Sequence, residues 1–251
     1  MTWRDSLAEN YTDGLLILHR NKVVYEYYSG CLTPHQPHAA MSMTKSFTGL
    51  LAEILIASDQ LDEQALVSSI IPELHKSAFG DATVRQVMDM TTSLQYSEHY
   101  ADPNSDIWKY SYVVDALGTA FAGGGLSATL RDLGRIGQLM LDEGKVDGMQ
   151  VIPKAVVDSI RKGGDKQAFK LGGFSSLPGG SYKSMWWVFH NSHQAFAARG
   201  VHGQTIYVDP IAEMVIVRLA SHPSAANAVI DPTSLPAYQA VAEYLRAMNR
   251  N

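Results

Sequence analysis

The stretch Gln204–Leu219, QTIYVDPIAEMVIVRL, decides the fold class. It holds two runs rich in β-branched and aromatic residues, Gln204–Val208 and Glu213–Leu219, on either side of Asp209-Pro210. Such runs around a short turn-forming pair are typical of a β-hairpin. Because a hairpin joins antiparallel neighbours, this stretch predicts an antiparallel sheet.

Further strands and helices are predicted on both sides of this hairpin. Met185–Phe189 and a second hairpin, Gly14–Tyr28, are expected to add strands. Apolar spacing and helix-start residues predict helices at Ser42–Ala57, Val84–Met90, 129–142, Pro153–Ile160 and Pro236–Met248. The apolar face of the first helix is expected to consist of Phe47, Leu50, Leu51, Ile54 and Leu55. This order of strands, helices, strands and helix favours an α+β fold with an antiparallel sheet flanked by helices over a doubly wound parallel sheet.

Length and composition describe a globular chain of one large or two small domains. The 251 residues include 46% apolar and 18% charged side chains, and the net charge is −5. An acidic balance argues against nucleic acid as a partner, and no stretch approaches the roughly 20 apolar residues of a membrane span. The lone Cys31 excludes an internal disulfide and a cysteine zinc site. Because Met1–Asn10 lacks a signal-peptide pattern, a cytoplasmic location is expected.

Ser42-Met43-Thr44-Lys45 is a candidate nucleophile motif, S-x-x-K. At a helix start, residues i and i+3 share a face, so the Lys45 amine can reach the Ser42 hydroxyl. A serine becomes a good nucleophile when a nearby base takes its proton, and lysine is such a base only when neutral. The helix N-terminus favours neutral lysine and also offers N–H groups to developing negative charge. The alternative is that Ser42 is a plain helix cap.

The same pattern occurs once more, at Ser159-Ile160-Arg161-Lys162. This second match falls at a predicted helix end beside Gly163-Gly164, where the helix dipole favours a protonated lysine. Lys162 is therefore not expected to act as a base, and Ser42 is favoured over Ser159 as the nucleophile.

Residues Ala40–Phe47 resemble the nucleophile helix of the serine β-lactamase-like hydrolases, which include penicillin-binding proteins, class C β-lactamases, esterases and 6-aminohexanoate-oligomer hydrolases. The resemblance is strongest to the last subgroup. Further segments match that subgroup in order: Val84–Met90, Tyr96–Pro103, Ala122–Gly125, Ala128–Leu133, Met185–Trp187 and Gly200–Gln204.

The resemblance implies an acyl-enzyme mechanism in which Ser42 attacks an amide or ester carbonyl and Lys45 is the base. Ala198-Arg199-Gly200 stands where the β-lactamases have Lys-Thr-Gly on an inner strand. Gly200 would allow the backbone to approach a substrate closely. The N–H groups of Val201 and Ser42 would then form the oxyanion hole.

Three further residues are candidates with two interpretations each. Tyr100 matches a tyrosine that contacts the substrate amide in the subgroup, and otherwise it is an exposed loop aromatic. Trp187, with Trp186, is expected either to line an apolar pocket or to belong to the core, with at least one of the two in the core. His202 could serve in acid–base steps near neutral pH, but a hydrogen-bonded structural role is favoured. The pair His190 and His193 lacks a third metal ligand, so no metal is expected.

The second motif of the family, a tyrosine in Tyr-x-Asn, is missing. The matching segments break near 112–113, where relatives have a substantial helical segment. Either the protein contains a segment there that this sequence omits, or it lacks most of a helical subdomain. The first is favoured because the second would expose a large apolar surface. The expected division is a sheet core at 1–41 and 117–251 and a helical part at 42–116.

The sequence thus predicts a serine hydrolase that cleaves an amide or ester through a Ser42 acyl-enzyme, like a 6-aminohexanoate-oligomer hydrolase or a carboxylesterase. The expected substrate is a small molecule, no metal or cofactor is required, and a homodimer is possible. Two alternatives stay open. One is a non-catalytic relative that binds a ligand or partner, and the other is a β-lactamase or D-alanyl peptidase.

Overall fold

A seven-stranded antiparallel sheet forms the centre of the computed structural model, which describes residues 3–92, 94, 102, 104–106 and 121–248. The strand order is β2 (Lys22–Tyr28), β1 (Thr12–His19), β11 (Met214–Ala220), β10 (Gln204–Asp209), β9 (Phe196–Gly200), β8 (Trp186–Val188) and β7 (Ser181–Lys183). The β10–β11 hairpin predicted from Gln204–Leu219 is present in the register Thr205 to Arg218 through Asp209 to Met214. The predicted α+β class with an antiparallel sheet is confirmed.

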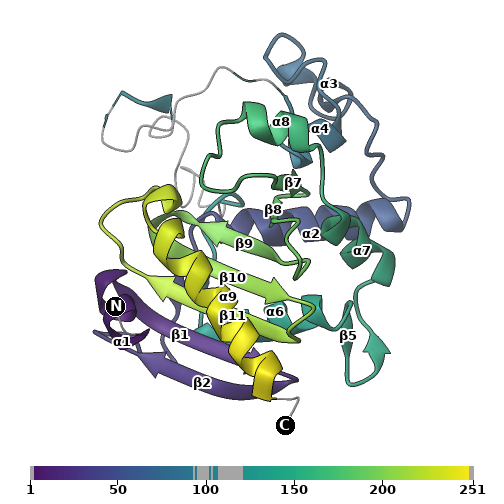
Figure 1. The fold of residues 1–251 in the computed structure, drawn as a ribbon. Coiled ribbons are helices and arrows are strands. Elements are labelled where there is room, and N and C mark those ends of the chain that lie inside the picture. Colours follow the sequence, from purple (N-terminus) through teal and green to yellow (C-terminus); the bar gives the residue numbers. More distant parts are fainter. Residues whose placement is uncertain (1–2, 93, 95–101, 103, 107–120, 249–251) are drawn as a thin grey trace.

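Helices cover both faces of the sheet. On one face lie α2 (Met43–Ala57), α6 (Leu130–Leu141) and α7 (Lys154–Lys162), and on the other lie α1 (Trp3–Glu9) and α9 (Asp231–Met248). Figure 1 shows α9 lying across the near face, with α2 and α6 behind the strands. Because successive side chains on a strand alternate in direction, β1 sends Leu16 to the α2–α6 side and Leu15 to the α9 side.

The remaining elements are short. They are β3 (His38–Ala39), α3 (Val67–Ile70), η1 (Pro72–Leu74), α4 (Val84–Met88), β4 (Ser127–Ala128), β5 (Lys145–Val146), β6 (Met149–Gln150), α8 (Lys166–Leu171), η2 (Val201–Gly203) and η3 (Asn227–Val229). The predicted helix at Pro236–Met248 begins five residues earlier, at Asp231, and holds Pro236 inside it. A proline in a helix removes one backbone donor, and the sequence pattern placed the helix start at that residue. The break near 112–113 lies outside the described residues.

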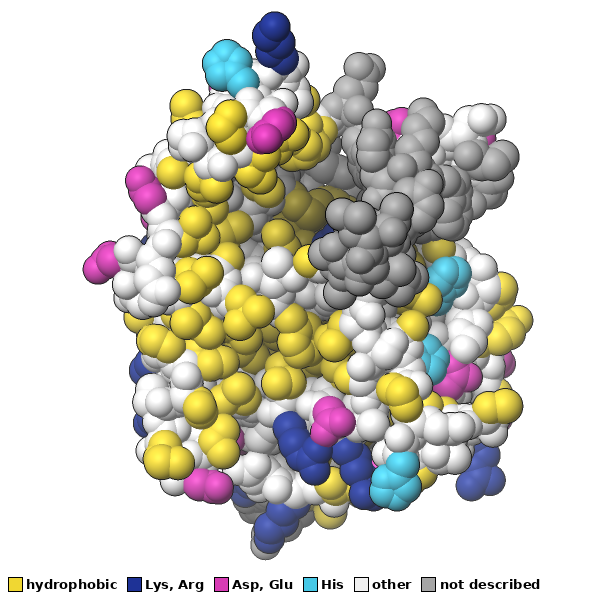
Figure 2. Space-filling model, turned by 180° about the vertical axis from the view of Figure 1, so that it is seen from behind, with side chains coloured by type: hydrophobic (Ala, Val, Ile, Leu, Met, Phe, Trp, Pro, Cys, Tyr) yellow, Lys and Arg dark blue, Asp and Glu magenta, His cyan; other side chains and the backbone are white. Residues whose placement is uncertain are grey.

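The predicted apolar face of α2 is only partly correct. Leu50 is buried, but the side chains of Leu51 and Leu55 are 62% and 40% exposed, whereas Ser46 and Glu53 are buried. Figure 2 views the side of the molecule that α2 covers and shows hydrophobic side chains gathered at its surface. The helix is therefore turned so that polar residues face the interior, where partners from other elements receive them.

Among the described residues, no helix combines the length and the apolar character that crossing a membrane requires.

Candidate active site

Ser42 stands at the start of α2, after a residue with unusual backbone angles. Met41 has φ of 50°, in the left-handed region that few non-glycine residues adopt, and Ser42 returns to helical angles. The Ser42 side chain makes no capping hydrogen bond to the helix. Ser42 is therefore the N-cap residue of α2 by position, but its hydroxyl is not used to cap the helix.

The structure brings Lys45 to Ser42. Lys45 Nζ lies 2.9 Å from Ser42 Oγ, one helical turn away, and 2.6 Å from the carbonyl oxygen of Gly123. The lysine thus bridges α2 and the glycine-rich turn at 123–125. Sequence patterns do not reveal this contact, because no local pattern pairs residues 78 positions apart. Thr48 fastens the same segment by donating to the Ala122 carbonyl over 2.9 Å.

The end of β9 lies directly against the turn before Ser42. A Cβ atom built on Gly200 would lie 2.6 Å from the Ala40 carbonyl oxygen and 3.1 Å from Met41 Cβ. A side chain at Gly200 would therefore separate β9 from the nucleophile turn. Sequence reasoning expected glycine for close approach to a substrate, and the structure shows its close approach to backbone. Val201 follows at the end of this strand, in η2.

His202 is held by hydrogen bonds in a left-handed conformation, with φ of 62°. The backbone N–H of His202 donates to the Ala225 carbonyl over 3.1 Å, and the ring nitrogen Nδ1 lies 2.8 Å from the His222 carbonyl oxygen. A carbonyl can only accept, so Nδ1 carries the proton in this arrangement. These contacts match the hydrogen-bonded role that the sequence favoured for His202.

The two tryptophans point to opposite faces of the sheet. Trp186 is fully buried and donates from Nε1 to the Ser46 carbonyl of α2 over 2.9 Å. Trp187 instead packs edge-on against Phe169, Phe174 and Tyr182. Trp187 thus belongs to an aromatic cluster on the sheet face opposite to that of Trp186, and no hydrogen bond or ring contact among the described residues joins it to Ser42. Tyr100 lies outside the described residues.

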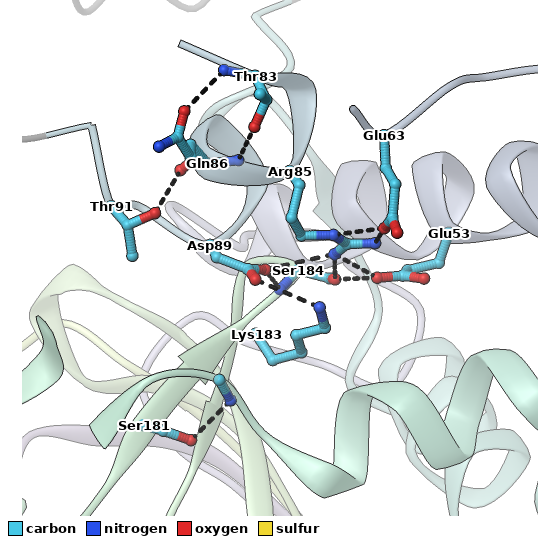
Figure 3. A network of polar contacts seen from close by, with 11 residues as sticks. Glu53, Glu63, Thr83, Arg85, Gln86, Asp89, Thr91, Ser181, Lys183 and Ser184 are labelled. Atoms are coloured by element: carbon cyan, nitrogen blue, oxygen red, sulfur yellow. Dashed lines mark hydrogen bonds and ion pairs between the residues drawn. The ribbon is translucent and has the colours of Figure 1, made fainter. Parts of the chain in front are cut away.

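A buried polar network fixes α2 against α4 and the β7–β8 turn (Figure 3). The Arg85 guanidinium of α4 donates to Glu53 of α2 at 2.7 Å, to Glu63 and to Ser184 in the turn. Ser184 Oγ also bonds Glu53, and Asp89 accepts from the Ser184 N–H over 2.9 Å. These contacts explain why Glu53 faces the interior on a helix whose leucines are partly exposed.

Charge pairing in this network changes the pKa values of Arg85 and Glu63. Burial opposes the charge on Arg85, but the hydrogen bonds that it donates to Glu53 and Glu63 outweigh burial and raise the pKa of the guanidinium. The hydrogen bond from Arg85 lowers the pKa of Glu63. Both groups are thus held in their charged forms near neutral pH, and the network stays intact.

The backbone of α2 also meets the β7–β8 turn directly. A Cβ on Gly49 would clash with the Ser184 carbonyl oxygen, because it would come much closer than van der Waals contact allows. A larger residue at this position would therefore force the helix away. Ser46 Oγ donates to the Met185 carbonyl over 2.6 Å. The helix that carries Ser42 and Lys45 is thereby anchored over its first two turns.

The described residues include no group of three or more His, Cys, Asp and Glu side chains arranged to hold a metal ion. His190 Nε2 lies 2.7 Å from Ser181 Oγ, and His193 lies between Asp209 and Glu243 at 2.7 and 2.9 Å. The two histidines therefore bind different partners and do not act as a pair.

A serine beside a lysine on an anchored helix, facing the end of a sheet strand, defines a candidate for acyl transfer on an α+β hydrolase fold. The family model described as Beta-lactamase matches residues 5–121. The 6-aminohexanoate-dimer hydrolase of Paenarthrobacter ureafaciens is 30% identical over 291 residues, covering 86% of this chain and 74% of that relative.

Solved structures show the same likeness. A Bacillus anthracis protein proposed to be a 6-aminohexanoate-dimer hydrolase superposes with a TM-score of 0.82 at 26% identity, over 98% of this chain and 83% of that one. A class C β-lactamase shares the fold at a TM-score of 0.60 and 15% identity, with 90% and 91% of the two chains covered. This chain belongs to the β-lactamase family of serine hydrolases.

Proposed function

We propose that this protein cleaves an amide or ester bond of a small molecule through a covalent acyl-enzyme on Ser42. The observation that carries the proposal is the 2.9 Å contact between Lys45 Nζ and Ser42 Oγ at the start of α2. That distance is within the range over which a general base takes a proton from a nucleophile.

In the proposed reaction, neutral Lys45 accepts the hydroxyl proton while Ser42 Oγ forms a bond to the substrate carbonyl carbon. The carbonyl electron pair moves to oxygen and returns when the C–N or C–O bond breaks. Lys45 then gives its proton to the leaving amine or alcohol. A water molecule repeats these steps on the acyl-enzyme, releasing the acid and restoring the Ser42 hydroxyl.

A linear amide or ester is the favoured substrate class rather than a β-lactam. Ala198-Arg199-Gly200 replaces the Lys-Thr-Gly expected of a β-lactamase, and the 30% identical relative is named a 6-aminohexanoate-dimer hydrolase. Side-by-side assays of short p-nitrophenyl esters, aminohexanoate amides and a chromogenic cephalosporin test this preference. Faster turnover of the cephalosporin than of every linear substrate would contradict it.

Site-directed variants test the nucleophile. We expect Ser42→Ala to abolish p-nitrophenyl ester hydrolysis and to prevent labelling by a fluorophosphonate probe. Ser159→Ala is the matched control, because Ser159 opens the other S-x-x-K sequence and should not affect either readout. Hydrolysis that survives in Ser42→Ala would refute the site. A folded wild-type protein that neither hydrolyses nor labels would favour the non-catalytic alternative.

A further inference from the structure

Two side chains outside the Ser42–Lys45 pair hold the peptide units that supply the proposed oxyanion donors. The inference rests on the proposed function, in which the N–H groups of Ser42 and Val201 stabilise the negative charge that develops on the substrate oxygen. Neither N–H group donates a hydrogen bond to a described residue. Both are therefore available to a ligand as far as the described part of the chain extends.

The first peptide unit joins Met41 to Ser42. Its carbonyl oxygen accepts from Thr44 Oγ1 over 2.7 Å and from the Thr44 N–H over 3.0 Å. Since a trans peptide is planar and its C=O and N–H point in opposite directions, fixing the oxygen fixes the direction of the Ser42 N–H. The Thr44 hydroxyl also accepts from the Leu126 N–H over 3.1 Å, so it is itself held in place.

The second peptide unit joins Gly200 to Val201. Asn227 of η3 donates from Nδ2 to the Gly200 carbonyl oxygen over 3.0 Å. By the same planarity, this contact directs the Val201 N–H away from η3. Gly200 has no side chain to restrict its peptide unit, and Asn227 supplies that restriction from 27 residues further along the chain.

The surroundings of Asn227 keep this arrangement rigid. Two carbonyl groups of the segment that carries Asn227 accept hydrogen bonds from His202. The Ala225 carbonyl accepts from the His202 backbone N–H, and the His222 carbonyl accepts from Nδ1 of its ring. The buried Gln204 side chain bridges to β11 through Ala220, bonding both its carbonyl and its N–H. The turn at 201–203 is thus braced from two sides.

We infer that Thr44 and Asn227 are positioning residues of the oxyanion hole. Each one bonds the carbonyl end of a peptide unit whose N–H end faces the reacting oxygen. A hydrogen bond at the carbonyl also polarises the peptide unit and strengthens its N–H as a donor. Their contribution is therefore larger in the transition state, where the oxygen is charged, than in the bound substrate.

Substitutions that keep the side-chain shape but remove the hydrogen bond test the inference. Asn227→Asp keeps the side-chain volume but loses the donor at neutral pH, and Thr44→Val keeps the shape but loses the hydroxyl. We expect each to lower kcat for p-nitrophenyl ester hydrolysis by about 10- to 100-fold, since losing an oxyanion donor outright costs about 10²–10³. KM should change by less than about twofold, and Thr44→Ser should restore most of the rate.

Matched controls exist elsewhere in the chain. Thr233 bonds the Ile230 carbonyl three residues earlier, as Thr44 bonds Met41, and Asn10 donates from Nδ2 to the Ser6 carbonyl. Thr233→Val and Asn10→Ala should leave kcat unchanged even where they lower the melting temperature. Affinity for a boronic acid that mimics the tetrahedral intermediate should fall in parallel with kcat in the site variants alone.

The outcomes separate this inference from the proposed function. Loss of activity only in proportion to loss of folded protein, or a change in KM with kcat intact, overturns the positioning role. Unchanged kcat in both Asn227→Asp and Thr44→Val overturns it as well. A wild-type protein without Ser42-dependent hydrolysis overturns the proposed function itself, before any of these variants is compared.

Discussion

Gly200 lies so close to Ala40 that a Cβ atom on Gly200 would stand 2.6 Å from the Ala40 carbonyl oxygen. Gly200→Ala should therefore push β9 away from the turn that carries Ser42. We expect hydrolysis to fall by about 10²-fold, the effect of a shift near 1 Å in an active site. The free energy of unfolding should fall by about 1–3 kcal/mol, as for other overpacked positions. Kinetics well below the melting temperature separate the two effects.

Gly49→Ala is the comparison for that variant, since it creates a closer clash, with the Ser184 carbonyl, seven residues along α2 from Ser42. It should lower stability while retaining more activity per folded molecule. An active Gly200→Ala enzyme with normal kcat would contradict the close contact at the nucleophile turn.

Lys45→Arg tests whether Lys45 acts as a base. A guanidinium stays protonated throughout the accessible pH range, so it can preserve a hydrogen bond but cannot accept the Ser42 proton. We expect kcat to fall by about 10²–10⁴-fold, the usual contribution of a general base. Lys154→Arg, a surface lysine in ion pairs with Glu143 and Asp158, serves as the control and should be neutral. Near-normal turnover by Lys45→Arg would show that another group takes the proton.

The sequence predicts contacts between residues that are close together in the chain better than contacts between distant ones. The hairpins and the S-x-x-K contact follow from local patterns, and the structure contains both. In contrast, the hydrogen bonds from Lys45 to Gly123 and from Asn227 to Gly200 join segments far apart in the chain. A single sequence without relatives does not reveal such contacts. For the two tryptophans the sequence predicts only that at least one lies in the core, and strand alternation puts Trp186 there and Trp187 on the other face of the sheet.

The orientation of α2 shows the same limit in energetic terms. An apolar-spacing argument puts Leu51 and Leu55 inside and Glu53 outside, and the structure shows the reverse. A buried carboxylate is tolerated only with charged and hydrogen-bonding partners, and Arg85 and Ser184 supply them. Since these partners lie 32 and 131 residues away, hydrophobic periodicity could not have predicted them.

Arg85→Met should therefore be strongly destabilising. It leaves the Glu53 carboxylate buried without its cation, and removing one partner of a buried pair costs about 3–5 kcal/mol. Urea denaturation of the wild type and the variant measures the loss. The double variant Arg85→Met with Glu53→Met should recover much of it, because the most deeply buried carboxylate is then gone, Asp89 keeps Lys183 as its cation and Glu63 is 38% exposed. In contrast, Arg135→Met removes an exposed pair with Asp132 and should cost less than about 1 kcal/mol.

The exposed leucines also bear on the length of the protein. Leu51 and Leu55 stand at the surface, and the match to the Paenarthrobacter relative spans 291 residues, more than the 251 of this chain. We expect the protein from its natural source to carry an additional segment near 112–113 that covers apolar surface. Intact-mass spectrometry tests this, and a mass near 27.5 kDa would contradict it. In that case we expect slow turnover despite an intact Ser42.

His190 should make stability depend on pH in a defined direction. Burial, with a smaller contribution from nearby Lys166, lowers the pKa of His190 below its usual 6.5, so the folded state disfavours the charged form. The unfolded chain then binds more protons, and stability rises with pH across this window. The His190 contribution is complete above about pH 6.5 and is lost as the pH falls through the lowered pKa. Melting temperatures from pH 7.5 to 5 should decline more steeply for the wild type than for His190→Gln, whereas the exposed His35→Gln should follow the wild type.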